Sequence, residues 1–256
     1  MNAKPSLSFC ITCKNRMHQI RHTLRKNLQD NRMHSDSIEF VLVDFSSRDG
    51  LREWITGNFQ DELASGYLKY FYTDNLPQWH ACVAKNTVHL CATGNILVNL
   101  DCDNFTGVWG GAFLIKTFSK YSDLCVVHQF GGIIGDGSYG RISVKRDFFY
   151  SIGGYDESFE PMGYQDDDLL ERLTAIGLKY IACSNRLYSL AIPNTKEEGI
   201  SQTQSTKNYS QMIDANFEKS RRNLSDGRLV ANHGKFGIHE GLFDHKGEYH
   251  NPNNLL

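Results

Sequence analysis

The sequence predicts an α/β fold in which a mostly parallel central sheet is flanked by helices. Short apolar runs alternate with segments of helical periodicity through residue 105. The runs are apolar along most of their length, as strands buried on both faces of a parallel sheet are. One of them, Ile96 to Leu100, leads mid-chain into two carboxylates, Asp101 and Asp103. The carboxyl edge of such a sheet is where α/β folds bind their ligands.

The first half of the chain repeats a strand followed by a helix. Strands are expected over residues 7–12, 39–44, 68–72 and 96–100, and helices over residues 17–28, 51–59 and 79–91. The second strand ends in Asp44. This carboxylate could accept a hydrogen bond from a bound nucleoside, and it could equally cap its own loop.

The second half continues the pattern in a less regular order. A helix is expected over residues 109–118, strands over 124–129, 141–145 and 179–183, and a glycine-rich loop over 130–140. Asp166, Asp167 and Asp168 then open an amphipathic helix. Carboxylates at a helix N-terminus are favoured by about 0.3–1 kcal/mol each, so capping alone would explain them. One of them could instead act as a general base that points into a cleft.

The composition excludes several classes of partner. The formal net charge is −2 and charged residues make up 22% of the chain, so no polybasic face for nucleic acid is expected. No apolar run has the length of a transmembrane helix, and no apolar signal region precedes the first strand. The seven cysteines are scattered, which is typical of free thiols in a reducing compartment. We therefore expect a cytoplasmic protein.

Asp101 and Asp103 are the candidate ligands of a metal ion. Residues i and i+2 of an extended chain point to the same side, so both carboxylates can face one ligand. Two carboxylates without a neighbouring Lys or Arg suit a hard divalent cation that shares its other positions with phosphate oxygens. The same residues could also form a solvated turn after the strand.

The chain becomes polar from about Asn194, and a helix is expected over residues 212–223. Four of the ten histidines fall in this segment, at His233, His239, His245 and His250. Most of them should be solvated, and one at most could reach the metal. The segment could cover the ligand-binding cleft, mediate oligomerisation or contact a membrane-bound partner.

Seven short motifs occur in an order and spacing that resemble a known family. They are Thr12 and Arg16 at the end of the first strand, Asp44-Phe-Ser-Ser, Lys85-Asn86, Asp101-Cys-Asp103, Gly140 ahead of a strand, Gly153-Gly-Tyr-Asp-Glu157 and Gln165-Asp166-Asp-Asp-Leu169. On these residues the chain resembles GT-A fold glycosyltransferases of the large inverting family two type. Its middle and later parts are similar to the galactosyltransferase family. The resemblance covers most of residues 6–190.

This resemblance implies a binding site for a UDP-sugar. Thr12 and Asp44 would hold the uracil and ribose, and Trp79 would lie against the base. Lys14 and Arg16 would approach the diphosphate. The full nucleotide-binding set that the resemblance implies is Thr12, Lys14, Arg16, Asp44, Trp79, Lys85, Asn86 and Asp101.

The resemblance also implies a metal and a catalytic base. Asp101 would contact ribose or a metal-bound water, and Asp103 would ligate Mn²⁺ or Mg²⁺ between the two phosphates. Asp166 falls on the catalytic base. Gln165 and Asp167 fall on the acceptor side of the site.

The sequence departs from the family at two places. Gln165 stands where the family usually has Glu, so the acceptor cannot be transferred from the family. The histidine expected as a further metal ligand would fall near Pro193 or Asn194, and neither is a histidine. His233 or His239 would replace it as a ligand, or else water would.

The implied protein is an inverting, metal-dependent glycosyltransferase that moves a sugar from a UDP-sugar to a hydroxyl of a glycan or glycolipid. By analogy, it would act in bacterial surface polysaccharide synthesis, building capsule or lipopolysaccharide. Residues 1–193 would form the GT-A domain, with a nucleotide-binding half over 1–105, an acceptor and catalytic half over 106–193, and an extension over 194–256. Peripheral membrane contact and oligomerisation stay open. The alternative is a non-catalytic nucleotide-sugar-binding scaffold or sensor on the same fold.

Overall fold

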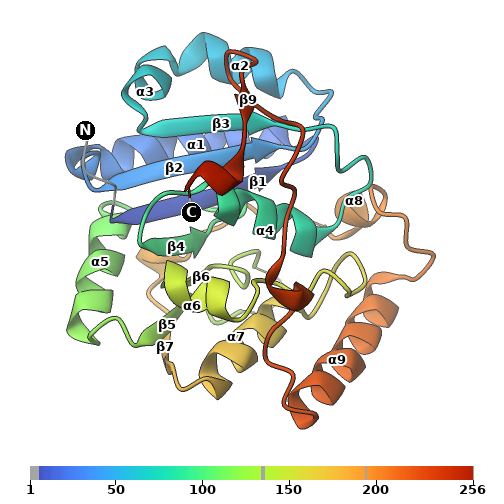
Figure 1. Cartoon of the computed structure of the whole chain (residues 1–256). Helices are drawn as coiled ribbons and strands as arrows, with labels where there is room; N and C mark the ends of the chain where they lie inside the picture. The colour runs from blue at the N-terminus through green and yellow to red at the C-terminus, as the bar shows by residue number, and fades with distance from the viewer. Residues whose placement is uncertain (1–5, 134–135, 194, 256) are drawn as a thin grey trace.

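A computed structural model of the chain describes residues 6–133, 136–193 and 195–255. Its centre is one sheet with helices on both faces (Figure 1). The strands lie in the order β7-β5-β6-β4-β1-β2-β3-β8-β9, and every parallel ladder is longer than every antiparallel one. The predicted fold class is therefore confirmed.

The first half of the chain builds the parallel centre of the sheet. Its strands are β1 (Leu7–Cys13), β2 (Ile38–Asp44), β3 (Leu68–Tyr72) and β4 (Ile96–Asn99). Its helices are α1 (Met17–Asn31), α2 (Leu51–Asn58), α3 (Gln60–Ser65) and α4 (Ala81–Cys91). A 3₁₀ turn, η1 (Arg32–His34), follows α1. Because β4, β1, β2 and β3 run in the same direction, their carboxyl ends meet at one edge.

The second half adds an antiparallel strand between two parallel ones. Its elements are α5 (Gly110–Lys120), β5 (Cys125–Gln129), β6 (Ile142–Lys145), α6 (Arg146–Ser151), α7 (Gln165–Ala175), β7 (Lys179–Cys183) and the 3₁₀ turn η2 (Arg186–Tyr188). β6 pairs antiparallel with both β4 and β5, whereas β5 and β7 pair in parallel. The predicted strands of both halves are present with nearly the expected bounds. The short helices α3 and α6 were not predicted.

The core lies in two layers, one on each face of the sheet. Side chains of β1 alternate between them, since Phe9 and Ile11 belong to one cluster and Cys10 to the other. Helices α1, α2, α3 and α5 cover the layer of Phe9. Helices α4, α6 and α7 cover the layer of Cys10.

The polar C-terminal segment is folded into the same body. It contains α8 (Glu197–Ile200), α9 (Tyr209–Ser225), η3 (Asn232–Gly234), β8 (Leu242–Asp244), β9 (Tyr249–His250) and η4 (Pro252–Leu255). A capping box between Asn208 and Gln211 sets the start of α9. β8 pairs antiparallel with β3, and the side chain of Leu242 is fully buried in the core. The segment thus completes one edge of the sheet.

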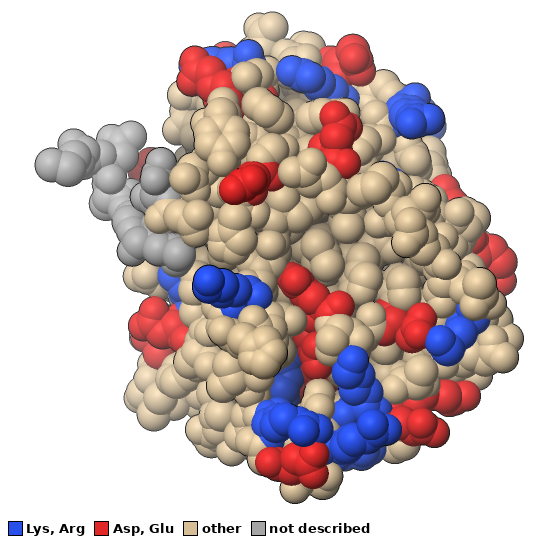
Figure 2. Space-filling view, turned by 45° about the vertical axis from the view of Figure 1, so that its right-hand side comes forward, with Lys and Arg blue, Asp and Glu red and all other residues tan. Residues whose placement is uncertain are grey.

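The surface carries charges of both signs. Figure 2 shows basic and acidic side chains interspersed over one face, with several basic side chains gathered toward its lower end. Among the residues that the structure describes, no helix combines the length and the apolar character needed to cross a bilayer.

Candidate active site

A cavity of about 660 Å³ opens at the carboxyl ends of β1 and β4. Most of the predicted site residues line it, namely Thr12, Lys14, Arg16, Trp79, Lys85, Asp101, Asp103, Gln165, Asp166 and Asp167. They come from the ends of two strands and the turn after β1, from α4 and the segment before it, and from the start of α7. The fold therefore gathers residues that are up to 155 positions apart in the sequence into one site.

The register of the sheet explains why the first strand and the carboxylate pair meet. β1 and β4 are parallel neighbours, with Cys10 opposite Asn99. The chain leaves both strands at the same edge, so Thr12 and Asp101 face the same space. Asn99 fixes this edge because its Nδ2 donates to Asp101 Oδ1 at 3.2 Å and to the carbonyl oxygen of Gly140 at 2.8 Å.

Gly140 lies where three charged groups converge. A Cβ atom at this position would be 2.9 Å from Asp101 Oδ2, 3.1 Å from Lys85 Nζ and 3.3 Å from Asp166 Oδ2. Contacts of this length leave no room for a side chain. Because residue 140 has no side chain, the carboxylates of Asp101 and Asp166 can both approach the ammonium group of Lys85.

Lys85 of α4 and Asp166 of α7 form a buried ion pair at the cavity. Lys85 Nζ lies 2.6 Å from Asp166 Oδ1, and only 4% of Lys85 is exposed. Burial lowers the pKa of this ammonium, but the charges of Asp166 and Asp101 outweigh burial and raise it overall. Lys85 is therefore a fixed cation beneath the predicted base. Its Nζ also lies 5.2 Å from the ring centroid of Tyr155.

The three carboxylates at the start of α7 have three different environments. Asp166 binds Lys85, and Asp167 accepts a hydrogen bond from the hydroxyl of Tyr139. Burial raises the pKa of Asp167. Asp168 points away from the cavity, where it accepts hydrogen bonds from Arg172 Nε and Ser220 Oγ, both at 2.8 Å. Asp168 anchors α7 to α9, and the other two line the cavity.

Asp103 is the more deeply buried member of the carboxylate pair, with 5% of its surface exposed. Burial and the neighbouring charge of Asp101 raise the pKa of Asp103 to about 6. A cation would relieve this repulsion, and carboxylate oxygens are the ligands that hard divalent cations prefer. The two carboxylates therefore fit Mn²⁺ or Mg²⁺. They form a pair only. In the described part of the chain, no cluster of three or more His, Cys, Asp and Glu side chains is arranged to hold a metal ion.

The two histidines predicted as replacement metal ligands do not line this cavity. The His239 ring nitrogens lie 3.0 Å from the carbonyl oxygen of Phe236 and 2.9 Å from Asn253 Oδ1. His233 is exposed within η3. The structure thus does not bring either ring to Asp103, and Asn194 lies outside the described residues.

Lys14 and Asp44 are bound within the protein. Lys14 Nζ donates to the carbonyl oxygens of Phe45 at 2.6 Å and Leu76 at 3.2 Å, and burial lowers its pKa. The Asp44 carboxylate accepts from the Ser47 backbone N–H at 2.8 Å and from the Tyr70 hydroxyl at 2.7 Å. Burial raises the pKa of Asp44. Lys14 lines the cavity, but Asp44 caps its own loop behind the lining residues.

Asn86 has a scaffolding position behind the cavity. Its Oδ1 accepts from the backbone N–H of Tyr155 and its Nδ2 donates to the carbonyl oxygen of the same residue, both at 2.8 Å. A Cβ on Gly154 would lie 2.4 Å from Asn86 Oδ1. The Gly153-Gly154 turn therefore packs directly on Asn86, which places Tyr155 under Lys85.

The segment from Thr195 to Gln202 forms one wall of the cavity. Glu198 Oε2 lies 2.8 Å from Arg16 Nη1. The carbonyl oxygen of Gln202 accepts from the Trp79 backbone N–H at 2.7 Å. Sequence reasoning did not single out these contacts, nor the lining residues Tyr139, Tyr209 and Ile213. A polar segment about 180 residues after β1 carries no pattern that reveals such pairing.

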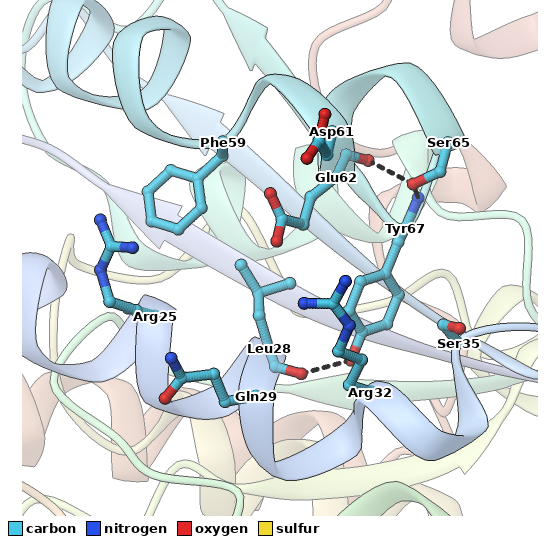
Figure 3. Close-up of a pocket in the computed structure, with 10 residues that line it drawn as sticks. All are labelled: Arg25, Leu28, Gln29, Arg32, Ser35, Phe59, Asp61, Glu62, Ser65 and Tyr67. Carbon is cyan, nitrogen blue, oxygen red and sulfur yellow. Dashed lines mark hydrogen bonds between the residues drawn. The ribbon is translucent and has the colours of Figure 1, made fainter.

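A second, smaller cavity of about 380 Å³ lies between α1 and α3 (Figure 3). Its charged lining residues are Arg25, Arg32, Asp61 and Glu62, and none of the predicted site residues lines it. The guanidinium of Arg25 lies 5.1 Å from the ring centroid of Phe59 and donates to Asn58 Oδ1 at 3.2 Å. The larger cavity is therefore the candidate active site.

Comparison with known proteins supports this assignment. Residues 128–195, from β5 to the segment after β7, match a family model described as the N-terminal domain of galactosyltransferase. No curated protein sequence matches the chain significantly. The matched residues include Tyr139, Gly140 and the start of α7, which line the cavity.

Several solved structures share the fold. A mannosyltransferase from Pyrobaculum calidifontis, PcManGT, superposes with a TM-score of 0.62 at 16% identity, covering 86% of this chain and 65% of that one. TarS from S. aureus gives 0.61 at 15% identity, covering 81% and 64%. GalNAc-T7 gives 0.58 at 17% identity, covering 72% and 43%. The chain thus spans slightly less than two thirds of the first two solved chains.

These matches define the fold of the chain. The chain has the GT-A fold of glycosyltransferases, and the predicted resemblance is confirmed. Its later half carries the galactosyltransferase-like region that the resemblance implied.

Proposed function

We propose that this protein is an inverting glycosyltransferase that moves a sugar from a UDP-sugar to a hydroxyl of a glycan or glycolipid acceptor. One observation carries the proposal. A single cavity in a GT-A fold holds both the carboxylate pair Asp101 and Asp103 and the ion pair of Lys85 and Asp166. The first pair suits a metal-bound diphosphate, and the second holds a base.

Asp166 is the proposed catalytic base. The acceptor oxygen attacks the anomeric carbon from the face opposite UDP, forming the new glycosidic bond as the bond to the diphosphate breaks. Asp166 takes the hydroxyl proton, and UDP leaves with the bonding electron pair. Lys85 Nζ, 2.6 Å from Asp166 Oδ1, holds the carboxylate in place. Positioned proton transfer of this kind typically contributes about 10²–10⁴-fold in rate.

The donor would lie across β1 and β4. Trp79 and Thr12 would contact the base, and Arg16 would reach the diphosphate. Lys14, held by backbone carbonyls, would act nearer the nucleoside. Asp44 and Asn86 would support this wall from behind, as their buried hydrogen bonds indicate.

A divalent cation would be held by Asp103, with Asp101 close to it. Bound Mn²⁺ or Mg²⁺ supplies positive charge that stabilises the leaving diphosphate. The chain's own contribution is the pair of carboxylates and the neighbouring cation Arg16. The PcManGT structure is a complex with GDP-Man and Mn²⁺, and the crystal structure of GalNAc-T7 contains UDP, GalNAc and Mn²⁺, which supports this cofactor.

The acceptor would enter beside Gln165, Asp167 and Tyr139 at the start of α7. Asp167 and the Tyr139 hydroxyl form one hydrogen-bonded pair there, suited to sugar hydroxyls. We further infer a cytoplasmic bacterial enzyme of surface polysaccharide synthesis, by analogy with the family. The free thiols of all seven cysteines support a reducing compartment.

The test has two parts. First, thermal melts are recorded with UDP, GDP and UDP-sugars, each with and without Mn²⁺. A ligand at a hundredfold its dissociation constant should add about 2.7 kcal/mol of stability. Second, UDP release is measured from each UDP-sugar that binds. Binding of UDP without release from any donor, with or without glycan acceptors, would favour the non-catalytic sensor.

A further inference from the structure

We propose that Gln165 is a positioning residue that fixes the carboxylate of Asp166 through a hydrogen bond from its side-chain amide. This inference rests on the proposed role of Asp166 as the base. It concerns the one position of the motif at which the sequence departs from the Glu usual in the family.

Both carboxylate oxygens of Asp166 accept a hydrogen bond, each from a different donor. Lys85 Nζ donates to Oδ1 at 2.6 Å, and Gln165 Nε2 donates to Oδ2 at 3.0 Å. Both donors line the cavity. A carboxylate held at each oxygen cannot rotate freely about its side-chain torsions, so the direction of its remaining lone pairs is set.

The orientation of the Gln165 amide follows from chemistry. An ionised carboxylate can only accept hydrogen bonds, so the amide must turn its NH₂ group toward Asp166. Its Oε1 atom is then buried without a hydrogen-bond partner among the described residues. An unpaired buried oxygen is unfavourable. The contact between Nε2 and Asp166 is therefore the interaction that holds this side chain.

A Glu at this position could not make the same contact. Its carboxylate has no donor, and it would place another negative charge next to Asp166 in a cavity that already holds Asp101, Asp166 and Asp167. The buried ammonium of Lys85 already faces two of these groups. In this chain, the amide thus replaces a repulsive neighbour of the base with a hydrogen-bond donor.

Two variants test the inference. Gln165→Glu keeps the length and an oxygen but loses the donor, and Gln165→Met keeps the length without any polar atom. UDP release from the best UDP-sugar is measured with water as the acceptor. For both variants we expect kcat to fall about tenfold to a hundredfold, as misplaced catalytic groups do, with KM for the UDP-sugar within about twofold of the original.

A matched control uses the same substitution at the same helix position. Gln60 is the exposed first residue of α3, as Gln165 is the first residue of α7. Gln60→Glu should leave kcat unchanged. In an Asp166→Asn background, Gln165→Met should cause no further loss, because the residue acts through Asp166.

The outcomes separate this inference from the proposed function. If the original protein releases UDP and Gln165→Glu matches its kcat, the positioning role is wrong and the proposed function stands. If the losses in kcat add in the double variant, Gln165 acts independently of Asp166 and the inference is also wrong. If the original protein binds UDP and releases none from any donor, the proposed function itself fails.

Discussion

Glu198 Oε2 lies 2.8 Å from Arg16 Nη1, so an ion pair joins helix α8 to the N-cap residue of α1 beside the cavity. Arg16 is the cation expected to meet the diphosphate. In this structure its charge is already matched by a carboxylate. A partly exposed pair of this kind adds little stability, and a bound diphosphate would have to compete with Glu198 for the same guanidinium.

Glu198→Gln should therefore strengthen UDP binding by several fold, because it frees Arg16 without changing the shape of the side chain. Isothermal titration with UDP and Mn²⁺ measures the change. Glu197→Gln is the control, since Glu197 is exposed and adjacent. Unchanged or weaker binding in Glu198→Gln would show that the pair does not oppose the nucleotide.

Asp166→Asn should bind UDP as the original protein does but lose sugar transfer by about 10²–10⁴-fold, because the amide cannot take the acceptor proton. Steady-state UDP release and titration with UDP measure the two effects separately. Full activity in this variant would remove Asp166 from the role of base.

Metal removal and acidification should have related effects at Asp103. Burial and Asp101 raise the pKa of Asp103 to about 6, and a cation requires the ionised form. The melting temperature should be higher with UDP and Mn²⁺ than with UDP alone. This difference should be largest above pH 7 and should decrease as the pH falls through 6. EDTA or Asp103→Ala should abolish it at any pH. A metal effect that persists in Asp103→Ala would place the cation elsewhere.

Gly140→Ala should lower kcat while the protein stays folded. The added methyl group would lie 2.9 Å from Asp101 Oδ2 and 3.1 Å from Lys85 Nζ, so the charged cluster must separate. Gly57→Ala is the matched control because a Cβ there meets nothing within 4 Å. Circular dichroism checks folding, and UDP release checks activity. Equal kcat in both variants would show that the cluster tolerates this displacement.

The stability of the protein should fall in acid partly through His89. This ring is fully within the core, stacked on Phe149, and burial together with the charges of Lys85 and Arg146 lowers its pKa to about 3. The unfolded chain takes up a proton near pH 6.5, but the folded chain does not until about pH 3. Between these values the free energy of unfolding should decrease by up to about 1.4 kcal/mol per pH unit as the pH falls.

His89→Gln should flatten this dependence in urea unfolding experiments between pH 7 and pH 4. His233→Gln, the same substitution at an exposed position, provides the control. Identical slopes in the original protein and in His89→Gln would mean that other groups cause the loss of stability in acid.

The fold was predictable because its signals are local. Apolar runs such as residues 38–44 and 96–99 are strands in the structure, and the carboxylates of Asp101 and Asp166 face one cavity as the motif order implied. The short helix α6 escaped prediction because six residues show too little periodicity.

Side-chain partners were less predictable. The resemblance implied that Lys14 approaches the diphosphate, but its ammonium donates to the carbonyl oxygens of Phe45 and Leu76. The ion pair between Arg16 and Glu198, and the pairing of β8 with β3, join segments that are distant along the chain. Such contacts form only when the whole chain has folded, and they produce no repeating pattern of residues in the sequence.

The position of β8 has a consequence for the order of folding during synthesis. β3 ends at Tyr72, but its outer partner begins only at Leu242. While the ribosome makes the intervening residues, the end of the β3 edge that β8 later covers, at Phe71 and Tyr72, is open to other chains. At translation rates of about 5–20 residues per second, this lasts roughly ten to thirty seconds. Nascent chains, and chains cut before residue 242, are thus the forms of this protein most exposed to strand-to-strand aggregation.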